Sequence, residues 1–277
     1  MSHSPLAGRT ILMSGGSRGI GLAIAVRVAR EGANVALVAK TAVPHPRLPG
    51  TIHTAAAKIE AAGGRCLPIV GDIRDCATVA RAVQSCVERF GGIDILVNNA
   101  SAIDLGGVGE VEPKRFDLML DVNVRGTFAL TSAALPHLLE SGHAHVLTLS
   151  PPLNPDRRWL ATHAPYTLTK YAMTMLTLGV AEQHRGRVAA NCLWPQSLIA
   201  TAAVSNVVAG EVGMRAARIP EIMADAAAVI LASNPTERSG HCYIDADVLR
   251  STGQTDLSAY TAVPGTPDEE LELDLFV

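Results

Sequence analysis

Short apolar runs alternate along this chain with longer segments in which apolar residues recur at helical spacing. Runs rich in Val, Ile, Leu and Ala predict strands buried on both faces, and the helical spacing predicts helices that bury one face. Alternation of the two is typical of βαβ units and favours a parallel sheet. Strands are expected at residues 10–14, 34–39, 65–70, 94–98, 145–150, 188–193 and 242–244. Helices are expected at residues 20–31, 51–61, 77–90, 115–139, 166–184 and 221–232.

The pattern therefore predicts an α/β fold with a doubly wound parallel sheet of about seven strands and helices on both faces, a Rossmann-type layout. Residues 1–250 are expected to form this single domain, and residues 251–277 a polar, then acidic tail that packs on the domain or on a neighbouring subunit. Residues 41–50 and 151–165 hold three and four prolines, which predicts loops because proline donates no backbone hydrogen bond.

Composition narrows the function classes. The net charge is -3 and no cluster of Lys and Arg occurs, so a nucleic-acid partner is not expected. No signal-like start and no apolar run long enough for a membrane span is present, which predicts a cytoplasmic protein. The five cysteines form no C-x-x-C pair and lie without His at ligand spacing, so reduced thiols and no metal site are expected.

The first chemical signal is a glycine-rich turn between the first expected strand and the first expected helix. A phosphate that approaches a helix N-terminus meets free N–H groups, and glycine removes the Cβ that would block it. An ordinary glycine-rich turn is the alternative, because the spacing G-x-x-x-G-x-G is looser than the dinucleotide fingerprint. The candidate phosphate-binding residues are Ser14, Gly15, Ser17, Arg18, Gly19, Ile20 and Gly21.

The second signal follows the second strand, where many NAD-binding domains place a carboxylate against the adenosine ribose. Here the strand ends in Ala39 and Lys40, with no carboxylate. Lys40 and Arg18 are both suited to pair with a 2′-phosphate, which favours NADP(H) over NAD(H). The alternative is a solvated surface lysine and an arginine that merely begins a helix.

The third signal is Tyr166 with Lys170, one helical turn apart and therefore on one helix face. A nearby ammonium stabilises phenolate and is expected to lower the tyrosine pKa from about 10, so that the phenol exchanges a proton with a carbonyl or alcohol oxygen. A Tyr and a Lys at this spacing are more often a plain surface pair. The dinucleotide-binding layout is what gives this pair its meaning.

These residues resemble the short-chain dehydrogenase/reductase family, in which Y-x-x-x-K follows T-G-x-x-x-G-x-G at a similar interval. The likeness covers nearly the whole chain and implies an NAD(P)-dependent oxidoreductase that acts on CH–OH or C=O groups, with Tyr166 as proton donor or acceptor, Lys170 on the nicotinamide ribose and Asn123 positioning a water. By the same resemblance the further cofactor-binding residues are Asp72, Ile73, Asn99, Ala100, Pro195, Ile199 and Thr201.

One departure from the family pattern bears on activity. The family's catalytic serine place is occupied by Pro151, and Ser150 is the replacement candidate if its hydroxyl faces the site. Without it the reacting oxygen loses one donor. Ser101 in place of the glycine of N-N-A-G is a smaller departure. The alternative function is an NADP(H)-binding scaffold or sensor with little turnover, and a second alternative is an NAD(H)-dependent dehydrogenase.

Residues 202–220 are expected to cover the substrate, and their small apolar side chains favour an apolar, lipid-like carbonyl or alcohol compound. Arg215 and Arg218 in this segment are interpreted either as part of a solvated helix face or as contacts for an anionic handle of the substrate. The resemblance implies a homodimer or homotetramer that packs through residues 115–139 and 166–184.

Overall fold

The seven strands form one parallel sheet in the order β3-β2-β1-β4-β5-β6-β7. The computed structural model describes residues 4–44 and 49–277. Every strand pairs parallel with its neighbour, which requires crossover connections, and helices supply them. The strands are β1 Thr10–Ser14, β2 Asn34–Ala39, β3 Arg65–Val70, β4 Ile95–Asn98, β5 His145–Thr148, β6 Ala189–Trp194 and β7 Cys242–Ile244.

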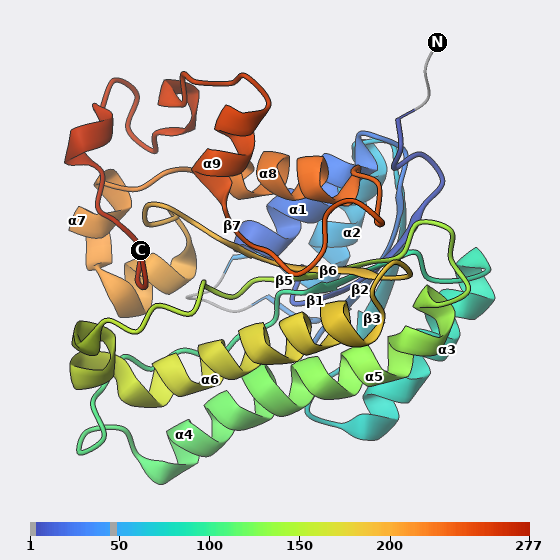
Figure 1. Cartoon of the computed structure of the whole chain (residues 1–277), viewed down its shortest axis with the longest axis horizontal. Coiled ribbons are helices and arrows are strands. Elements are labelled where there is room, and N and C mark those ends of the chain that lie inside the picture. The colour runs from blue at the N-terminus through green and yellow to red at the C-terminus, as the bar shows by residue number, and fades with distance from the viewer. Residues whose placement is uncertain (1–3, 45–48) are drawn as a thin grey trace.

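Helices cover both faces of the sheet (Figure 1). On one face α1, α2, α8 and α9 pack on the sheet in one apolar cluster, and on the other face α3 and α5 pack with part of α6 in a second cluster. The predicted fold class is confirmed. The helices are α1 Gly19–Ala29, α2 Ile52–Ala61, α3 Cys76–Phe90, α4 Pro113–Met119, α5 Thr127–Leu138, α6 Arg157–Gln183, α7 Gly210–Arg215, α8 Glu221–Leu231 and α9 Asp245–Ser251, with π-helical turns at Leu120–Gly126 and Val204–Val208 and 3₁₀ turns at Ser258–Tyr260 and Asp268–Glu270.

The prediction of a loop over residues 151–165 is wrong from Arg157 onward, where α6 begins. Three of the four prolines precede the helix, and the Asp156 carboxylate caps it by accepting from the Arg158 N–H at 2.9 Å. Pro165 lies inside, and the helix kinks just before it at His163, with φ -131° and ψ 28°. Such a kink accommodates the missing proline donor without ending the helix.

Other boundaries differ by small amounts. The single helix expected at residues 115–139 is α4 and α5 joined by a π-helical turn, and β5 ends two residues before the expected 150. The sequence pattern also missed α7 and α9, which are too short to show a clear period. Of the expected loop at 41–50, residues 45–48 lie outside the described residues, and the remainder is neither helix nor strand.

Candidate active site

A cavity of about 980 Å³ lies beyond the carboxyl ends of the strands, between the glycine turn after β1 and the loop after β4. The sheet order reverses its direction of growth at β1 and β4, and α/β sheets bind ligands at such a switch point. The predicted cofactor-binding residues other than Ser14 line this cavity: Gly15, Ser17, Arg18, Gly19, Ile20, Gly21, Lys40, Asp72, Ile73, Asn99, Ala100, Tyr166, Lys170, Pro195, Ile199 and Thr201.

The glycine turn is shaped by close contact with the loop after β4. Gly15 has a φ of +78°, and a Cβ there would lie 2.8 Å from the Ala100 Cα. A Cβ on Gly21 would lie 2.4 Å from the Asn99 amide nitrogen. That amide donates to the Gly15 carbonyl at 2.9 Å, and the Ser14 hydroxyl accepts from the Ala100 N–H at 3.2 Å. Ser14 therefore joins the two loops rather than facing the cavity.

The N-terminus of α1 opens onto this cavity. Its N-cap is Arg18, whose side chain makes no capping hydrogen bond, so the first N–H groups of the helix stay available for an anion. The Arg18 guanidinium donates to the Gly50 carbonyl at 3.2 Å, and its Nε atom has no partner among the described residues. Arg18 thus lies at the mouth of the turn with donor capacity to spare.

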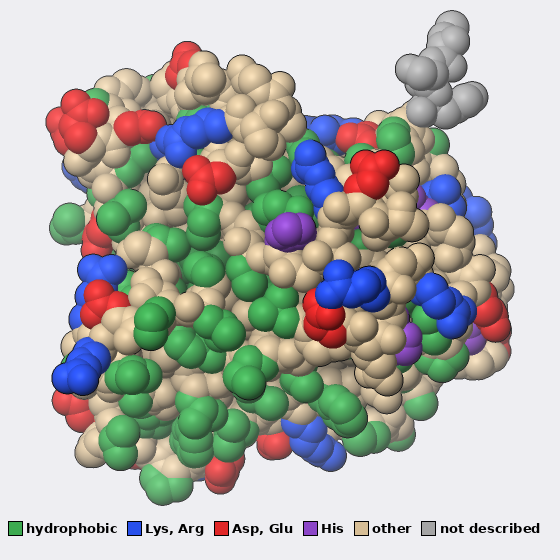
Figure 2. All heavy atoms as spheres, in the orientation of Figure 1, with side chains coloured by type: hydrophobic (Ala, Val, Ile, Leu, Met, Phe, Trp, Pro, Cys, Tyr) green, Lys and Arg blue, Asp and Glu red, His purple; other side chains and the backbone are tan. Residues whose placement is uncertain are grey.

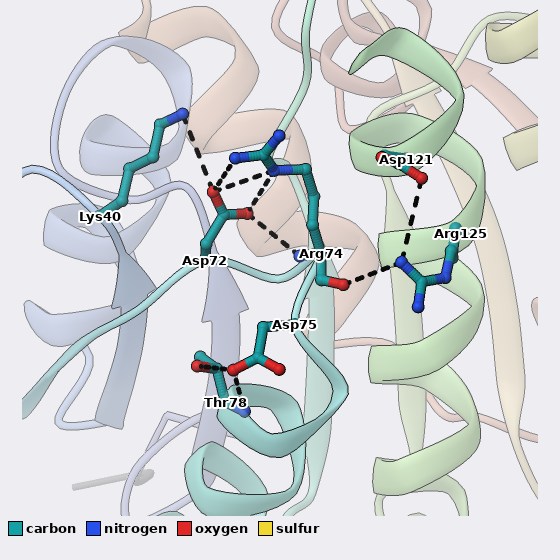
Figure 3. A network of polar contacts seen from close by, with 7 residues as sticks. All are labelled: Lys40, Asp72, Arg74, Asp75, Thr78, Asp121 and Arg125. Atoms are coloured by element: carbon teal, nitrogen blue, oxygen red, sulfur yellow. Dashed lines mark hydrogen bonds and ion pairs between the residues drawn. The ribbon is translucent and has the colours of Figure 1, made fainter. Parts of the chain in front are cut away.

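Lys40, at the end of β2, lies beside a carboxylate that is already paired (Figure 3). Asp72 accepts from Arg74 Nη2 at 2.8 Å and from Arg74 Nε at 3.0 Å, whereas Lys40 Nζ is 3.9 Å away. Hydrogen bonding by Arg74 holds the pKa of Asp72 below its ordinary value. The Lys40 side chain is 67% exposed and remains free to pair with another anion.

The same network fixes the turn that carries Asp72. Arg125 Nη1 donates to the Arg74 carbonyl at 3.0 Å, and Asp75 caps α3 by accepting from the Thr78 N–H (Figure 3). Ile73 packs in the cluster with α3 and α5. Asp72 and Ile73 therefore occupy a defined position at the wall of the cavity.

Tyr166 and Lys170 lie on α6, and both side chains are almost fully buried. Lys170 Nζ donates to the Leu149 carbonyl at 2.7 Å and lies 5.0 Å from the Trp194 ring centre. Burial lowers the pKa of Lys170 to about 7, and the Asp274 carboxylate opposes that shift.

The expectation that Lys170 lowers the tyrosine pKa is not met in this structure. Burial raises the pKa of Tyr166 well above its ordinary value, Asp274 raises it further, and a hydrogen bond with Ser101 lowers it in part. The reason is that the phenol is removed from water and faces a carboxylate.

Asn123 and Ser150, two predicted catalytic residues, are fully buried and are not among the described residues that line the cavity. The Asn123 amide donates to the Ala102 carbonyl at 2.9 Å, and its oxygen accepts from the Ala102 N–H at 2.7 Å. The Ser150 hydroxyl accepts from Thr174 Oγ1 of α6 at 3.0 Å. Asn123 fixes the loop after β4, and Ser150 is buried against α6.

The C-terminal segment, residues 271–277, supplies site residues that sequence reasoning missed. Asp274 and Leu275 line the cavity, because the segment pairs with the loop after β6: the Leu198 N–H donates to the Glu272 carbonyl at 2.9 Å, and the Asp274 N–H donates to the Gln196 carbonyl at 3.1 Å. Burial raises the pKa of Asp274 to about 8. The alternation of acidic and apolar residues was the one sequence signal for this docking.

An aromatic cluster anchors the end of this segment. The Phe276 ring is buried, and its centre lies 5.4 to 6.3 Å from the rings of four aromatic residues. Its partners are Trp159, Tyr166, Tyr171 and Trp194. The Trp194 indole also donates to the Leu275 carbonyl at 2.7 Å. Residues 271–277 are thereby held against α6.

The two arginines of the covering segment have different environments. Arg218 is buried and pairs with Asp268 at 2.7 Å, so both interpretations offered for it are wrong: it joins the segment to the C-terminal part of the chain. Arg215 is exposed on α7. The cavity wall in this segment is formed by small or apolar side chains together with one amide, from Ala202, Ala203, Val204, Asn206, Val208 and Pro220.

None of the helices in the described part of the chain is long and apolar enough to cross a bilayer. Within residues 4–44 and 49–277, no group of three or more His, Cys, Asp or Glu side chains is placed to hold a metal ion.

Comparison with known proteins identifies the family. The short chain dehydrogenase family model matches residues 9–211. Residues 39–46, 98–103 and 149–154 carry a closer resemblance to the dehydrogenase part of hydroxysteroid dehydrogenase-like protein 2; residues 45 and 46 among them lie outside the described residues. That resemblance is confirmed: the Danio rerio protein of this name is 52% identical over 262 residues, which cover 95% of this chain and 63% of that protein. This chain thus spans less than two thirds of that relative.

Solved structures agree with this assignment. A putative dehydrogenase from Xanthomonas campestris has a TM-score of 0.93 and 49% identity, with 98% of each chain covered. A short chain dehydrogenase from Mycobacterium thermoresistibile has a TM-score of 0.91 and 55% identity, covering 98% of this chain and 96% of that one. The chain therefore belongs to the short-chain dehydrogenase family and is an oxidoreductase by its family.

Proposed function

We propose that this protein transfers hydride between NADP(H) and the carbonyl or alcohol group of an apolar, lipid-like substrate. The observation that carries the proposal is that the glycine turn, Lys40, Tyr166 and Lys170 all line the same cavity. When bound, the cofactor supplies the hydride, and the protein supplies placement and electrostatics.

The residues of the cavity fit a dinucleotide. Gly15 and Gly21 let the glycine turn pack closely on the loop after β4 while both line the cavity, and the uncapped N-terminus of α1 beside them would receive a pyrophosphate. Lys40 and Arg18 would hold a 2′-phosphate, since the carboxylate of Asp72 is already neutralised by Arg74. Lys170 would hold the nicotinamide ribose, and Pro195, Ile199 and Thr201 would cover the ring.

Tyr166 acts as the acid in this proposal. Its raised pKa keeps the phenol protonated at neutral pH, so the phenol has a proton to deliver to a carbonyl oxygen. An apolar substrate is supported by apolar side chains in the cavity lining, which include Ile103, Trp194 and Val204.

Cofactor titration with turnover measurements tests the proposal. Quenching of protein fluorescence should give a lower Kd for NADPH than for NADH. With a panel of medium-chain and long-chain ketones, the protein should consume NADPH, which is followed by the loss of absorbance at 340 nm. Tighter binding of NADH would replace NADP(H) by NAD(H) as the cofactor. Tight binding of NADPH without turnover on any carbonyl compound would instead favour the scaffold or sensor.

We also propose a homo-oligomer that packs through α5 and α6. Phe128 on α5 and Leu168 and Met175 on α6 are more than half exposed, although each side chain is apolar. Figure 2 shows apolar side chains gathered over the part of this face where α4, α5 and α6 run in Figure 1. Contiguous apolar surface of this kind is typical of an interface between protein chains.

A further inference from the structure

Reduction of a carbonyl places negative charge on its oxygen, and two hydrogen-bond donors stabilise that charge better than one. Tyr166 is one donor. The hydroxyl side chains that line the cavity besides Tyr166 are Ser17, Thr41, Ser101 and Thr201. Only a hydroxyl beside the phenol is able to act on the same oxygen.

Three of these hydroxyls belong to the glycine-turn end of the cavity. Ser17 is part of the turn itself, and Thr41 follows Lys40. The Thr201 methyl lies 3.4 Å from the place where a Cβ on Gly19 would be, so Thr201 packs on the turn as well. That leaves Ser101, which follows β4.

The backbone of Ser101 is fixed on both sides. Before it, the Ala100 N–H donates to the Ser14 hydroxyl at 3.2 Å. After it, the buried Asn123 amide clamps both the N–H and the carbonyl of Ala102, at 2.7 and 2.9 Å. Because the backbone is held on both sides, the Cα position of Ser101 is fixed relative to the cavity. A donor in a reaction site requires such a fixed position.

The Ser101 side chain itself is exposed to the cavity and weakly engaged. Its one hydrogen bond to the backbone is a long contact of 3.4 Å with the Ala102 carbonyl. The Tyr166 phenol lies next to it, because Tyr166 packs in one cluster with Ala102 and Ile103, which directly follow Ser101, and Ser101 and Tyr166 line the same cavity. A hydrogen bond between the two hydroxyls lowers the pKa of Tyr166. The serine hydroxyl and the phenol therefore meet at one point of the cavity wall.

The other serine candidate is not available at that point. The fully buried Ser150 hydroxyl accepts from Thr174 of α6, and Thr174 also donates to the Pro151 carbonyl at 2.7 Å. Nothing at the end of β5 offers a hydroxyl to the cavity, since Pro151 has none.

We propose that the Ser101 hydroxyl is the second hydrogen-bond donor to the reacting oxygen, beside Tyr166. The proposal rests on the proposed function. In the reduction, NADPH would supply the hydride for the new C–H bond, the C=O π bond would break, and its oxygen would take the proton of Tyr166, leaving a phenolate that solvent reprotonates. Ser101 keeps its proton and donates a hydrogen bond throughout. Pro151 and Ser101 are thus compensating departures from the family pattern.

Kinetics of the full chain test the proposal. Ser101→Ala should lower kcat by about 100-fold, the usual loss for one such donor, with the Kd for NADPH unchanged. Ser101→Thr should keep most of the activity because it keeps the hydroxyl. The matched control Ser150→Ala, which removes a buried hydroxyl that is not part of the cavity lining, should keep kcat. The proposal is overturned if Ser101→Ala keeps its activity, or if only Ser150→Ala or Asp274→Asn loses it.

A ternary crystal structure gives a readout that needs no turnover. With NADP⁺ and trifluoroethanol as the alcohol probe, Ser101 Oγ and Tyr166 Oη should both lie within about 3.2 Å of the probe oxygen. An alcohol that contacts Tyr166 alone contradicts the role of Ser101 while leaving the proposed function intact. A chain that binds neither NADP⁺ nor the alcohol contradicts the proposed function first, and Ser101 with it.

Discussion

Burial and the neighbouring Asp274 raise the pKa of the Tyr166 phenol, so Tyr166 would enter the proposed reduction with its proton in place. Tyr166→Phe removes the proton donor and should lower kcat by at least about 100-fold, while the Kd for NADPH stays the same. Tyr171→Phe is a matched control, since Tyr171 lies on the same helix and its hydroxyl donates to the Asn154 carbonyl instead. Equal kcat values for Tyr166→Phe and the wild type would rule out this mechanism.

The proposed preference for NADP(H) is tested at Lys40. Lys40→Asp replaces a cation by an anion where a 2′-phosphate would lie, so NADPH should lose affinity by about tenfold to hundredfold relative to NADH. Isothermal titration with each cofactor measures the ratio. Lys114→Asp, on exposed α4, should change neither Kd. An unchanged ratio in Lys40→Asp would place the 2′-phosphate contacts elsewhere.

Asp274 predicts a specific dependence of stability on pH. Its pKa is raised from 3.8 to about 8, mainly by burial and in part by Asp245, against the pull of Lys170. The folded chain therefore holds a proton that the unfolded chain has lost over this range. The Asp274 contribution to folding is most favourable below about pH 4 and declines until about pH 8.

Asp274→Asn removes that titration. Its Tm relative to the wild type should accordingly rise as the pH increases from about 4 to about 8 and stay constant above. Thermal melts of both proteins in buffers across this range measure the difference. A Tm difference that does not vary with pH would show that Asp274 titrates normally.

At the scale of elements, the C-terminal segment is held mainly by Phe276. Phe276→Ala should lower the free energy of unfolding by about 3 to 5 kcal/mol, because it leaves a void among Trp159, Tyr166, Tyr171 and Trp194. Urea unfolding measures the loss. Phe128→Ala removes the same ring from an exposed position on α5 and should cost far less in the monomer. Similar losses in the two variants would mean that the C-terminal end is not packed as described.

Sequence patterns identified the helices and strands whose hydrophobic period was long and regular. They failed where contacts between distant segments determined the local structure. The strands came within two residues because most of them are continuous buried runs; β3, with exposed ends, and β7, only partly buried, are the exceptions. The start of α6 at Arg157 was missed, since proline content favoured a loop and the packing of Trp159 on Phe276 is not visible in local sequence. Docking of Asp274 depends on strand-like pairing with residues 196–198, which are far away in the chain.

At the scale of the whole molecule, the site follows from topology. Parallel strands bring their carboxyl ends to one edge, so motifs as distant as Gly15 and Tyr166 were expected to meet, and both line one cavity. The direction of individual side chains was not predictable from spacing. Ser150 lies at the expected edge of the sheet but bonds to Thr174 of α6, and Asn123 bonds the Ala102 backbone instead of facing the cavity.

The proposed oligomer gives the prediction for the assembled molecule. Leu168 and Met175 are seven residues apart on α6 and so share one face, and they are exposed together with Phe128 of α5. A stable interface of standard size needs about 800 Å² from each partner with an apolar centre, and these side chains provide such a centre. Met175→Glu would place a charge there and should convert a dimer or tetramer to smaller species in light scattering coupled to gel filtration.

The matched control is Val212→Glu on α7, where the valine is also highly exposed but lies outside the α5–α6 surface. The molar mass of the Val212→Glu variant should equal that of the wild type. Because Tyr166 and Lys170 lie on the same helix as Met175, dissociation should also loosen α6 and lower kcat, more than it changes the Kd for NADPH at the glycine turn. A wild-type chain that is monomeric at micromolar concentration, or a Met175→Glu variant of unchanged mass, would show that this apolar face has another use.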